Sequence, residues 1–433
     1  MSYTQLIKDT LNILDLTIYF EENCLTKERY KGQICLIYKG TLQYTPEECP
    51  HCLCVVPSRI IRWGTTTVRL LLNEASEYRT YLELKKQRFK CKTCQRTFVA
   101  DTSVAEKHCF IRQKVRWSVV TRLKENTSMT GIARQKNSNS TSSVYRVMKR
   151  FYRPLNPFKQ TLPKVLCFDE FKSVRSVASA MSFIMMDGQR HELLDIVENR
   201  RLPYLERYFS RFSLATRKAV EFIVIDRYAP YVSLVKKLFP NAQLMIDRFH
   251  IVQHIGRTFL NHRVKETNTR LKSTSQYQRG LGKKMKRYWK LLQKEEAKLN
   301  DEKRVWRASF KDYLTESEIV DRLLATCPNL RQGYQLYQDV LYAVKKRDHS
   351  LFEVCLSREV SQLPETYATT LRTFKKFLPQ IRNALRYSYS NGPLECLNNH
   401  IKVLKRNAYG FRNFSHFKRR IMIFHGKTIL TKS

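Results

Sequence analysis

The chain has 433 residues, 42% of them hydrophobic and 12% aromatic, which excludes a mainly disordered protein and leaves room for several domains. Lys and Arg number 79 against 38 Asp and Glu, a formal charge of +41. This far exceeds the roughly 2–8 charges that keep a small domain soluble. The basic residues are spread along the chain rather than gathered beside an apolar helix, so nucleic acid is favoured over a membrane surface as the partner.

The N-terminal sequence MSYTQLIKDTLNIL lacks the charged, apolar and small segments of a signal peptide. No apolar run approaches the roughly 20 residues of a membrane span. We therefore expect a cytoplasmic protein with no membrane partner, associated with the nucleoid when it binds DNA. Reducing compartments disfavour disulfides, so the twelve cysteines are expected to be thiols or metal ligands.

Two Cys-x2-Cys pairs, CPHC and CKTC, stand in the first hundred residues. Each pair can place two thiolates on one tight turn, and together the pairs complete a tetrahedral site for structural Zn²⁺. The predicted ligands are Cys49, Cys52, Cys91 and Cys94. Cys54 remains an alternative to Cys52. Residues 66–72 and 81–89 have strand patterns between the pairs, so we predict a small β-rich zinc domain over residues 1–105.

Apolar residues recur at helical spacing between residues 113 and 153, with a polar break at 137–139. Three short helices at this spacing predict a helix-turn-helix domain over residues 106–153. Three-helix units without DNA remain the alternative. The third helix would present hydroxyl and basic side chains able to read base edges and hold phosphates in a major groove. These side chains belong to Thr141, Ser142, Arg146 and Lys149.

Five strand patterns follow two prolines that end this domain. The predicted strands are residues 164–171, 180–186, 193–197, 221–226 and 242–247. Asp187-Gly188 joins the second and third strands as a tight hairpin. Three antiparallel strands followed by strand–helix–strand units predict an α/β fold with a mixed sheet of the ribonuclease H type. Its first part would cover residues 154–257.

Residues 258–386 have an almost wholly helical pattern, rich in Lys and Arg and sparse in Gly and Pro. We interpret this segment as a basic helical insertion into the core. Trp289 and Trp306 are predicted to be core residues, with stacking on nucleic acid bases as the alternative.

Residues 387–433 would complete the core. Asn391-Gly392-Pro393 suits a helix start, because Asn can cap backbone N–H groups and Pro is tolerated in the first turn. Glu395 falls in that first turn, the one acid in a run that otherwise bears basic residues. At helical spacing, the basic side chains that follow on or beside its face would hold a phosphate backbone. They are Lys402, Lys405 and Arg406.

Asp169 and Asp226 stand at or near the ends of predicted strands, and such ends gather ligands on one edge of an α/β sheet. With Glu395 they would bind two Mg²⁺ or Mn²⁺ ions, which suits nuclease and strand-transfer chemistry. The alternative is that these aspartates only cap the following helices. Asp247 is the alternative second acid. We expect its strand to lie one place farther along the sheet from the strand that carries Asp169.

Several motifs resemble those of bacterial insertion-sequence transposases of the DDE class, in the ISL-three group. CPHC with CKTC resembles the group's zinc finger, FDEFK its first acidic motif, and IVIDRYAPY with LMIDRFHIV its central block. The segment SNGPLECLNNHIKVLKRNAYGFRNFSHFKRRI resembles its C-terminal signature. One departure is Cys396, which stands where a small Gly is expected after the Glu; the larger side chain is expected to crowd the helix.

The resemblance implies a ribonuclease H-like core, a helical insertion before the last acid, and cut-and-join reactions at terminal inverted repeats. On matching positions it implies Asp169, Asp226 and Glu395 as the catalytic acids. The partners would be element ends and target DNA, bound by a homodimer or higher oligomer. The alternatives are a zinc and helix-turn-helix regulator with an inactive core, or a nuclease of the same fold that does not join.

Overall fold

The computed structural model of the chain describes residues 2–104, 111, 113–135, 140–178, 180–226 and 229–426. The chain forms two compact units: unit 1 is Met1–Arg153 with Ile401–Ser433, and unit 2 is Pro154–His400. The predicted break at 137–139 and the residue pair 227–228 lie outside the described residues. Among the helices that are described, none has both the length and the apolarity that crossing a membrane requires.

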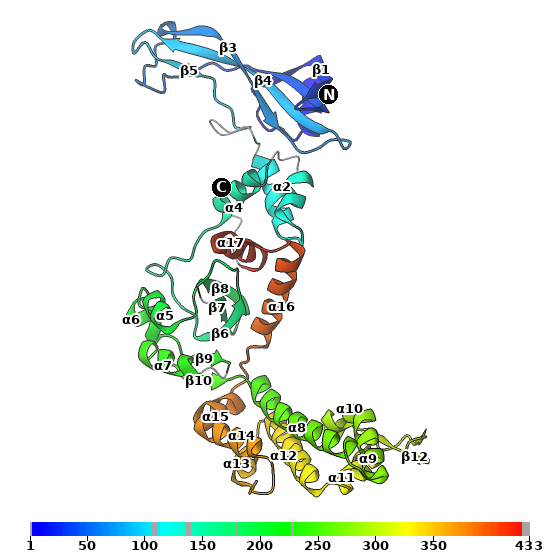
Figure 1. Ribbon diagram of the computed structural model, residues 1–433. Helices are drawn as coiled ribbons and strands as arrows, with labels where there is room; N and C mark the ends of the chain where they lie inside the picture. The colour runs from blue at the N-terminus through cyan, green and yellow to red at the C-terminus, as the bar shows by residue number, and fades with distance from the viewer. Residues whose placement is uncertain are drawn as a thin grey trace. The chain divides into compact units, whose positions relative to one another are not determined.

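Unit 1 begins with helix α1 (Tyr3–Thr10) and a five-stranded sheet (Figure 1). The strands are β1 (Ile18–Tyr30), β2 (Gln33–Leu42), β3 (Ile60–Leu71), β4 (Arg79–Cys91) and β5 (Thr97–Val99). Their order is β1-β2-β4-β3, with β5 on β4; β2 and β4 run parallel. The predicted strands were too short, because β3 and β4 stay paired as far as Ile60 and Cys91. This pairing brings the start of β3 beside the second cysteine pair.

Four helices form the second part of unit 1. They are α2 (Gln113–Leu123), α3 (Met129–Gln135), α4 (Thr141–Phe151) and α17 (Phe414–His425). Ile423 of α17 shares one apolar core with α2, α3 and α4. The Arg420 side chain is fully buried, and its guanidinium donates to the backbone oxygens of Glu125 and Thr127 at 2.7 and 3.0 Å. The chain end therefore packs with these helices, whereas the sequence pattern had grouped residues 387–433 with the core.

Unit 2 contains a mixed sheet in the order β10-β9-β6-β7-β8. Its strands are β6 (Val165–Lys172), β7 (Met181–Asp187), β8 (Glu192–Val197), β9 (Phe222–Ile225) and β10 (Gln243–Ile246). Strands β6, β7 and β8 are antiparallel, while β9 runs parallel to both β6 and β10. The predicted strand order is confirmed: the strand before Asp226 neighbours the one that carries Asp169.

Two helices, α5 (Leu202–Phe209) and α7 (Ala229–Leu238), supply an aromatic core against this sheet. The short helix α6 (Leu214–Lys218) lies between them in the sequence and has no buried residue. Phe168 of β6 and Phe183 of β7 contact Phe209 of α5 with ring centroids 5.5 and 5.8 Å apart. Phe239 and Tyr231 complete the same buried cluster. Packing on this scale fixes β6, and therefore the position of Asp169, inside the unit.

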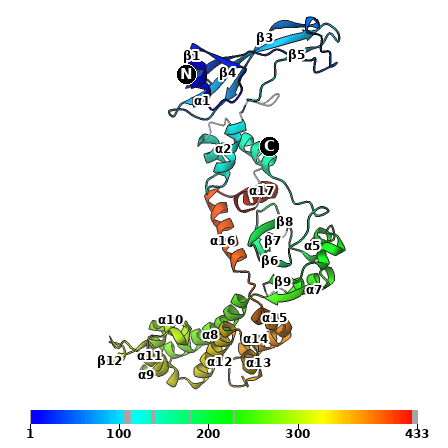
Figure 2. The ribbon, with the colours of Figure 1, turned by 180° about the vertical axis from the view of Figure 1, so that it is seen from behind.

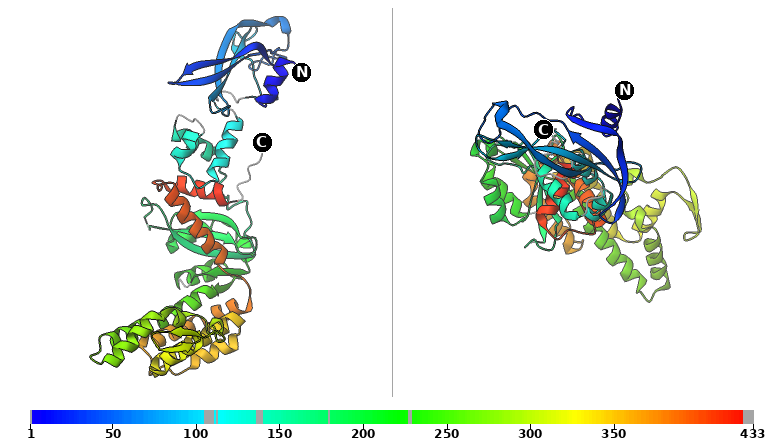
Figure 3. Two further views of the ribbon diagram at one scale, coloured as in Figure 1. Left: turned by 90° about the vertical axis from the view of Figure 1, so that its right-hand side faces the viewer. Right: turned by 90° about the horizontal axis from the view of Figure 1, so that it is seen from above.

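The insertion packs a core around the long helix α8 (Arg248–Leu271), and Ile246 of the sheet strand β10 also belongs to this core. Figure 3 shows the helices of this segment gathered on one side of the sheet. The other helices are α9 (Gln276–Arg287), α10 (Trp289–Gln293), α11 (Glu316–Ala325), α12 (Pro328–Lys346), α13 (His349–Ser357), α14 (Glu365–Lys376) and α15 (Leu378–Arg386). The helical prediction missed a two-stranded hairpin, β11 (Val305–Arg307) and β12 (Asp312–Leu314). The core assignment of Trp289 and Trp306 was wrong, because their side chains are 41% and 52% exposed.

Helix α16 (Gly392–Asn407) starts where the sequence predicted, with Glu395 in its first turn. Asn391, however, does not serve as the predicted side-chain cap. Its buried amide nitrogen donates to the backbone oxygen of Phe168 at 2.9 Å, and its backbone N–H donates to Asp247 at 2.6 Å. Asn391 therefore ties the start of α16 to the sheet. Cys396 is exposed, so it does not crowd the helix.

Candidate functional sites

The two cysteine pairs of unit 1 form loops with the same backbone conformation. Cys49 N–H donates to the oxygen of Cys54, and Cys91 N–H donates to the oxygen of Arg96, in each case five residues ahead. The residue that follows each pair is left-handed, with φ of 57° at Leu53 and 58° at Gln95. Each loop thus turns both of its thiols toward one side.

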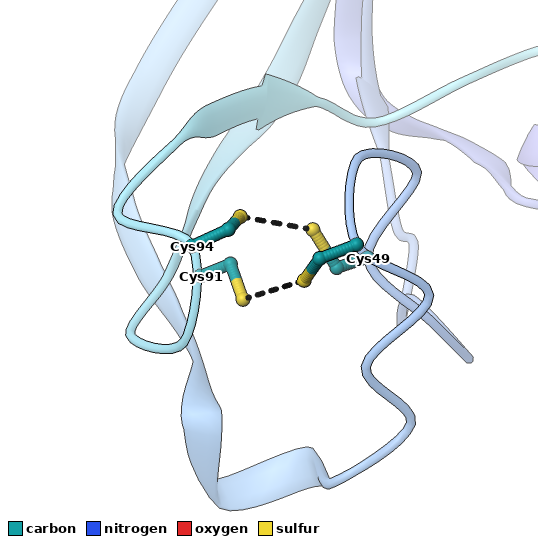
Figure 4. A group of neighbouring side chains, drawn as sticks. Cys49, Cys91 and Cys94 are labelled. Atoms are coloured by element: carbon teal, nitrogen blue, oxygen red, sulfur yellow. Dashed lines mark hydrogen bonds between the residues drawn. The ribbon is translucent and has the colours of Figure 1, made fainter.

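The four thiols converge from these two loops (Figure 4). The sulfur atoms of Cys49 and Cys94 are 3.7 Å apart, and so are those of Cys52 and Cys91. All four sulfur atoms lie within 4.8 Å of one another. A tetrahedral zinc ion with bonds of about 2.3 Å separates its sulfur ligands by about 3.8 Å, so the residues fit structural Zn²⁺.

Cys54 lies outside this cluster. It is half-buried, and the hydroxyl of Thr93 donates to its sulfur at 3.4 Å. The geometry therefore selects Cys52 rather than Cys54 as the fourth thiol.

The acids of unit 2 meet at the neighbouring strands β6 and β9. The last paired residues of these strands are Phe168 and Ile225. Because the strands are parallel, one further step along each brings Asp169 beside Asp226. Glu395 reaches the same place from the first turn of α16, because the ring of His250 contacts both Asp226 and Glu395. The structure thus brings three acids that are far apart in the sequence to neighbouring positions, although among the described residues only the four thiols lie close enough to share one ion.

His250 of α8 lies between two of these acids. Its Nδ1 is 3.3 Å from Asp226 Oδ1, and its Nε2 is 3.0 Å from Glu395 Oε1. Only 18% of its side chain is exposed, against 44% for Asp226 and 30% for Glu395. Sequence reasoning missed this residue. The available signal was the Asp247-Arg-Phe-His250 spacing, which places an imidazole in the first turn of a helix after a strand-end acid.

Asp169 is the most enclosed of the three acids. The Asn398 amide donates to its Oδ2 at 2.7 Å, and the backbone N–H of Glu170 donates to its Oδ1 at 2.7 Å. Burial raises the pKa of the Asp169 carboxyl to about 6, and the negative charges of Asp226 and Glu395 add to this effect. Burial likewise raises the pKa of Glu395. Carboxylates that disfavour one another's charge form a place where a cation is stabilised.

Asp247 has a different environment from Asp226. Its side chain is only 2% exposed, and it caps α8 by accepting the backbone N–H of Phe249 at 3.1 Å. Its other oxygen accepts the N–H of Asn391 at 2.6 Å. Both oxygens of Asp247 therefore accept backbone hydrogen bonds, which join the start of α8 to the start of α16.

The predicted DNA-contacting residues lie on two helices. On α4, Val144, Val147 and Met148 are buried, while the opposite side carries Ser142, Arg146 and Lys149, which are exposed, and Thr141, which is partly exposed. On α16, Lys402 and Arg406 are exposed and Lys405 is partly exposed. The side chain of Tyr145 stacks on His416 with ring centroids 4.1 Å apart, so α17 covers a different side of α4 from Arg146.

Clustered thiols in unit 1 and converging acids in unit 2 define a protein with two kinds of candidate metal site. Comparison with known proteins identifies the family. The chain belongs to the ISL3 family, because the family model described as Transposase matches residues 166–421, more than half of the sequence. A second model, described as the zinc-finger of transposase IS204/IS1001/IS1096/IS1165, matches residues 45–94 and thus spans both cysteine pairs.

One curated relative shares a shorter segment. A protein of Lactococcus lactis subsp. lactis, named ATP-dependent protease, is 69% identical over 118 residues. The match covers 27% of this chain and 38% of that protein's length. The family assignment rests on the match to the transposase model.

Proposed function

We propose that the protein is an active DNA transposase. It would bind the terminal inverted repeats of an insertion sequence, hydrolyse a phosphodiester bond there, and join the freed 3′-OH to target DNA. One observation carries this proposal: Asp169, Asp226 and Glu395 converge from β6, β9 and α16 in a chain of the transposase family. The sheet order, three antiparallel strands followed by two parallel ones, supports a core of the ribonuclease H type.

The three acids fit two Mg²⁺ or Mn²⁺ ions, since carboxylate oxygens are the ligands these hard cations prefer. When bound, such ions activate an attacking hydroxyl and stabilise the leaving oxygen. Asn398 would hold Asp169 in a fixed orientation by its hydrogen bond. His250 would contact both Asp226 and Glu395, so that the two mutually repelling carboxylates stay in place before DNA and metal arrive.

Unit 1 would supply DNA recognition. Helices α2, α3 and α4 are proposed as the helix-turn-helix, with Arg146 on the side of α4 that would enter a major groove. Helix α17 would act as its fourth helix, because buried Arg420 satisfies the backbone oxygens between α2 and α3. The zinc loops and the basic residues of α16 would add phosphate contacts, and the +41 charge predicts strongly salt-dependent binding.

The test is to incubate the full chain with duplex DNA carrying the element's own ends, with and without Mg²⁺. We expect Mg²⁺-dependent cleavage at the end, and joining when precut ends and target DNA are supplied. Asp169→Asn and Glu395→Gln should abolish both reactions while end binding survives. Asp321→Asn, which removes an exposed acid of α11, is the matched control and should cleave like the unaltered protein.

Two other outcomes of this experiment would each favour a different function. End binding without any cleavage under these conditions would select the regulator with an inactive core. Cleavage without joining of precut ends would select a nuclease of the same fold.

A further inference from the structure

The β11–β12 hairpin of the insertion presents two aromatic rings to solvent. Trp306 and Tyr313 form one cross-strand pair, and their side chains are 52% and 60% exposed. Their ring centroids are 5.2 Å apart with a tilt of 58°. Side chains alternate across a strand, so the neighbouring pair Val305 and Leu314 lies on the opposite face, where Leu314 is buried. The hairpin thus has an anchored face and an aromatic outer face.

Contacts with α9 and the residue after it hold the hairpin in place. Phe310 in the turn packs on Tyr288 with ring centroids 5.7 Å apart, and the hydroxyls of Ser309 and Tyr288 are hydrogen-bonded at 2.9 Å. The ammonium of Lys284 lies 4.5 Å from the centroid of the Phe310 ring. In Figures 1 and 2 the hairpin projects from the end of the insertion near α9 and α11. The aromatic pair is therefore fixed rather than carried on a loose loop.

Basic residues predominate around this aromatic face, although Asp301 and Glu302 are exposed next to Lys303. Helix α9 has the sequence QYQRGLGKKMKR, which contains five basic residues and no acid. Lys283, Lys286 and Arg287 are exposed on this helix, and Lys303 and Lys311 are exposed beside and within the hairpin. The acid of β12, Asp312, is paired with Arg322 of α11 at 2.6 Å. Rigid aromatic rings next to a cationic helix are the combination that binds single-stranded nucleic acid.

We propose that the outer face of this hairpin binds an unpaired DNA base by stacking, while α9 contacts the phosphates of the same strand. In a duplex the base faces are covered by their neighbours, so these rings can engage only a base that has left the stack. The two rings already contact each other, so the base stacks on them rather than between them. The proposal rests on the proposed function only in taking DNA as the polyanion, and it requires no cleavage.

The test compares two DNA probes in Mg²⁺-free buffer, with fluorescence anisotropy as the readout. One probe is a blunt duplex of random sequence, and the other is the same duplex with a single-stranded tail of about ten thymidines. Stacking of one base is worth roughly 5- to 150-fold in affinity. Trp306→Ala and, separately, Tyr313→Ala should lower affinity for the tailed probe in this range and leave blunt-duplex affinity unchanged. Trp306→Phe should retain most of the tailed-probe affinity.

Tyr342→Ala is the matched control, because it removes another exposed aromatic side chain of the insertion and should bind both probes normally. Thermal unfolding checks that each variant is folded, and the high exposure of both rings predicts little change. Equal losses on both probes, or no loss on the tailed probe, would overturn the proposal. The proposal would also be overturned if Trp306→Ala lost self-association but kept both DNA affinities. The outer face of the hairpin would then bind a second copy of the chain rather than DNA. All these variants are made in Glu395→Gln protein, so that DNA cleavage cannot change the measured affinities.

Discussion

The four-cysteine site and the carboxylate site gather their residues in opposite ways. The thiols stand on two short loops of one conformation, and all four sulfur atoms lie within 4.8 Å. The acids come from two strands and a helix spread over more than half the chain, and His250 lies between two of them. A metal site whose ligands stand on short loops is determined mainly by the local sequence of those loops. A site assembled from distant elements depends on the contacts that position those elements.

The largest effect should follow removal of a zinc ligand. Cys91→Ser removes one of the four thiols that would bind the zinc ion. Structural zinc contributes about 10–16 kcal/mol to the folding of small zinc modules. We expect loss of zinc and unfolding of the module that contains β3, β4 and the cysteine loops. Elemental analysis and circular dichroism measure both effects. Cys54→Ser is the control and should retain zinc; zinc loss in this control would make Cys54 a ligand.

The carboxylate site should instead be sensitive to a residue that is not itself an acid. Asn398→Ala removes the amide that holds Asp169 at 2.7 Å. Loss of a group that orients a metal ligand typically costs 10- to 100-fold in activity or metal affinity, so cleavage should fall by about that factor while zinc content stays unchanged. Asn399→Ala, at the exposed neighbouring position, should cleave nearly normally. Equal cleavage by both variants would remove the orienting role from Asn398.

A smaller effect is expected at Asp247, and it should appear in stability. Asp247→Asn keeps the shape of the side chain but weakens the hydrogen bonds from the N–H groups of Phe249 and Asn391. The loss should be about 1–2 kcal/mol, as for other helix caps and charge-assisted hydrogen bonds. Thermal unfolding should show a midpoint lower by a few degrees. An unchanged midpoint would show that this carboxylate does not hold α8 and the start of α16 together.

Local sequence patterns predicted the parts of the molecule that depend on neighbouring residues. The Cys-x2-Cys spacing identified the zinc loops, and buried strands followed by Asp226 and Asp247 gave the correct sheet order. Three features were missed because they depend on contacts across long separations. Arg420 buries its charge against α2 and α3, His250 lies between two acids, and Trp306 is exposed because it lies on a hairpin within a mainly helical segment.

We infer that Asp226, not Asp247, joins Asp169 and Glu395 in catalysis. The most direct test measures Mg²⁺-dependent cleavage and end binding of Asp226→Asn and Asp247→Asn side by side, below the unfolding temperature of each variant. We expect that Asp226→Asn binds the element end but does not cleave it, and that Asp247→Asn still cleaves. Full cleavage by Asp226→Asn, with none by a folded Asp247→Asn, would show instead that Asp247 has the metal role.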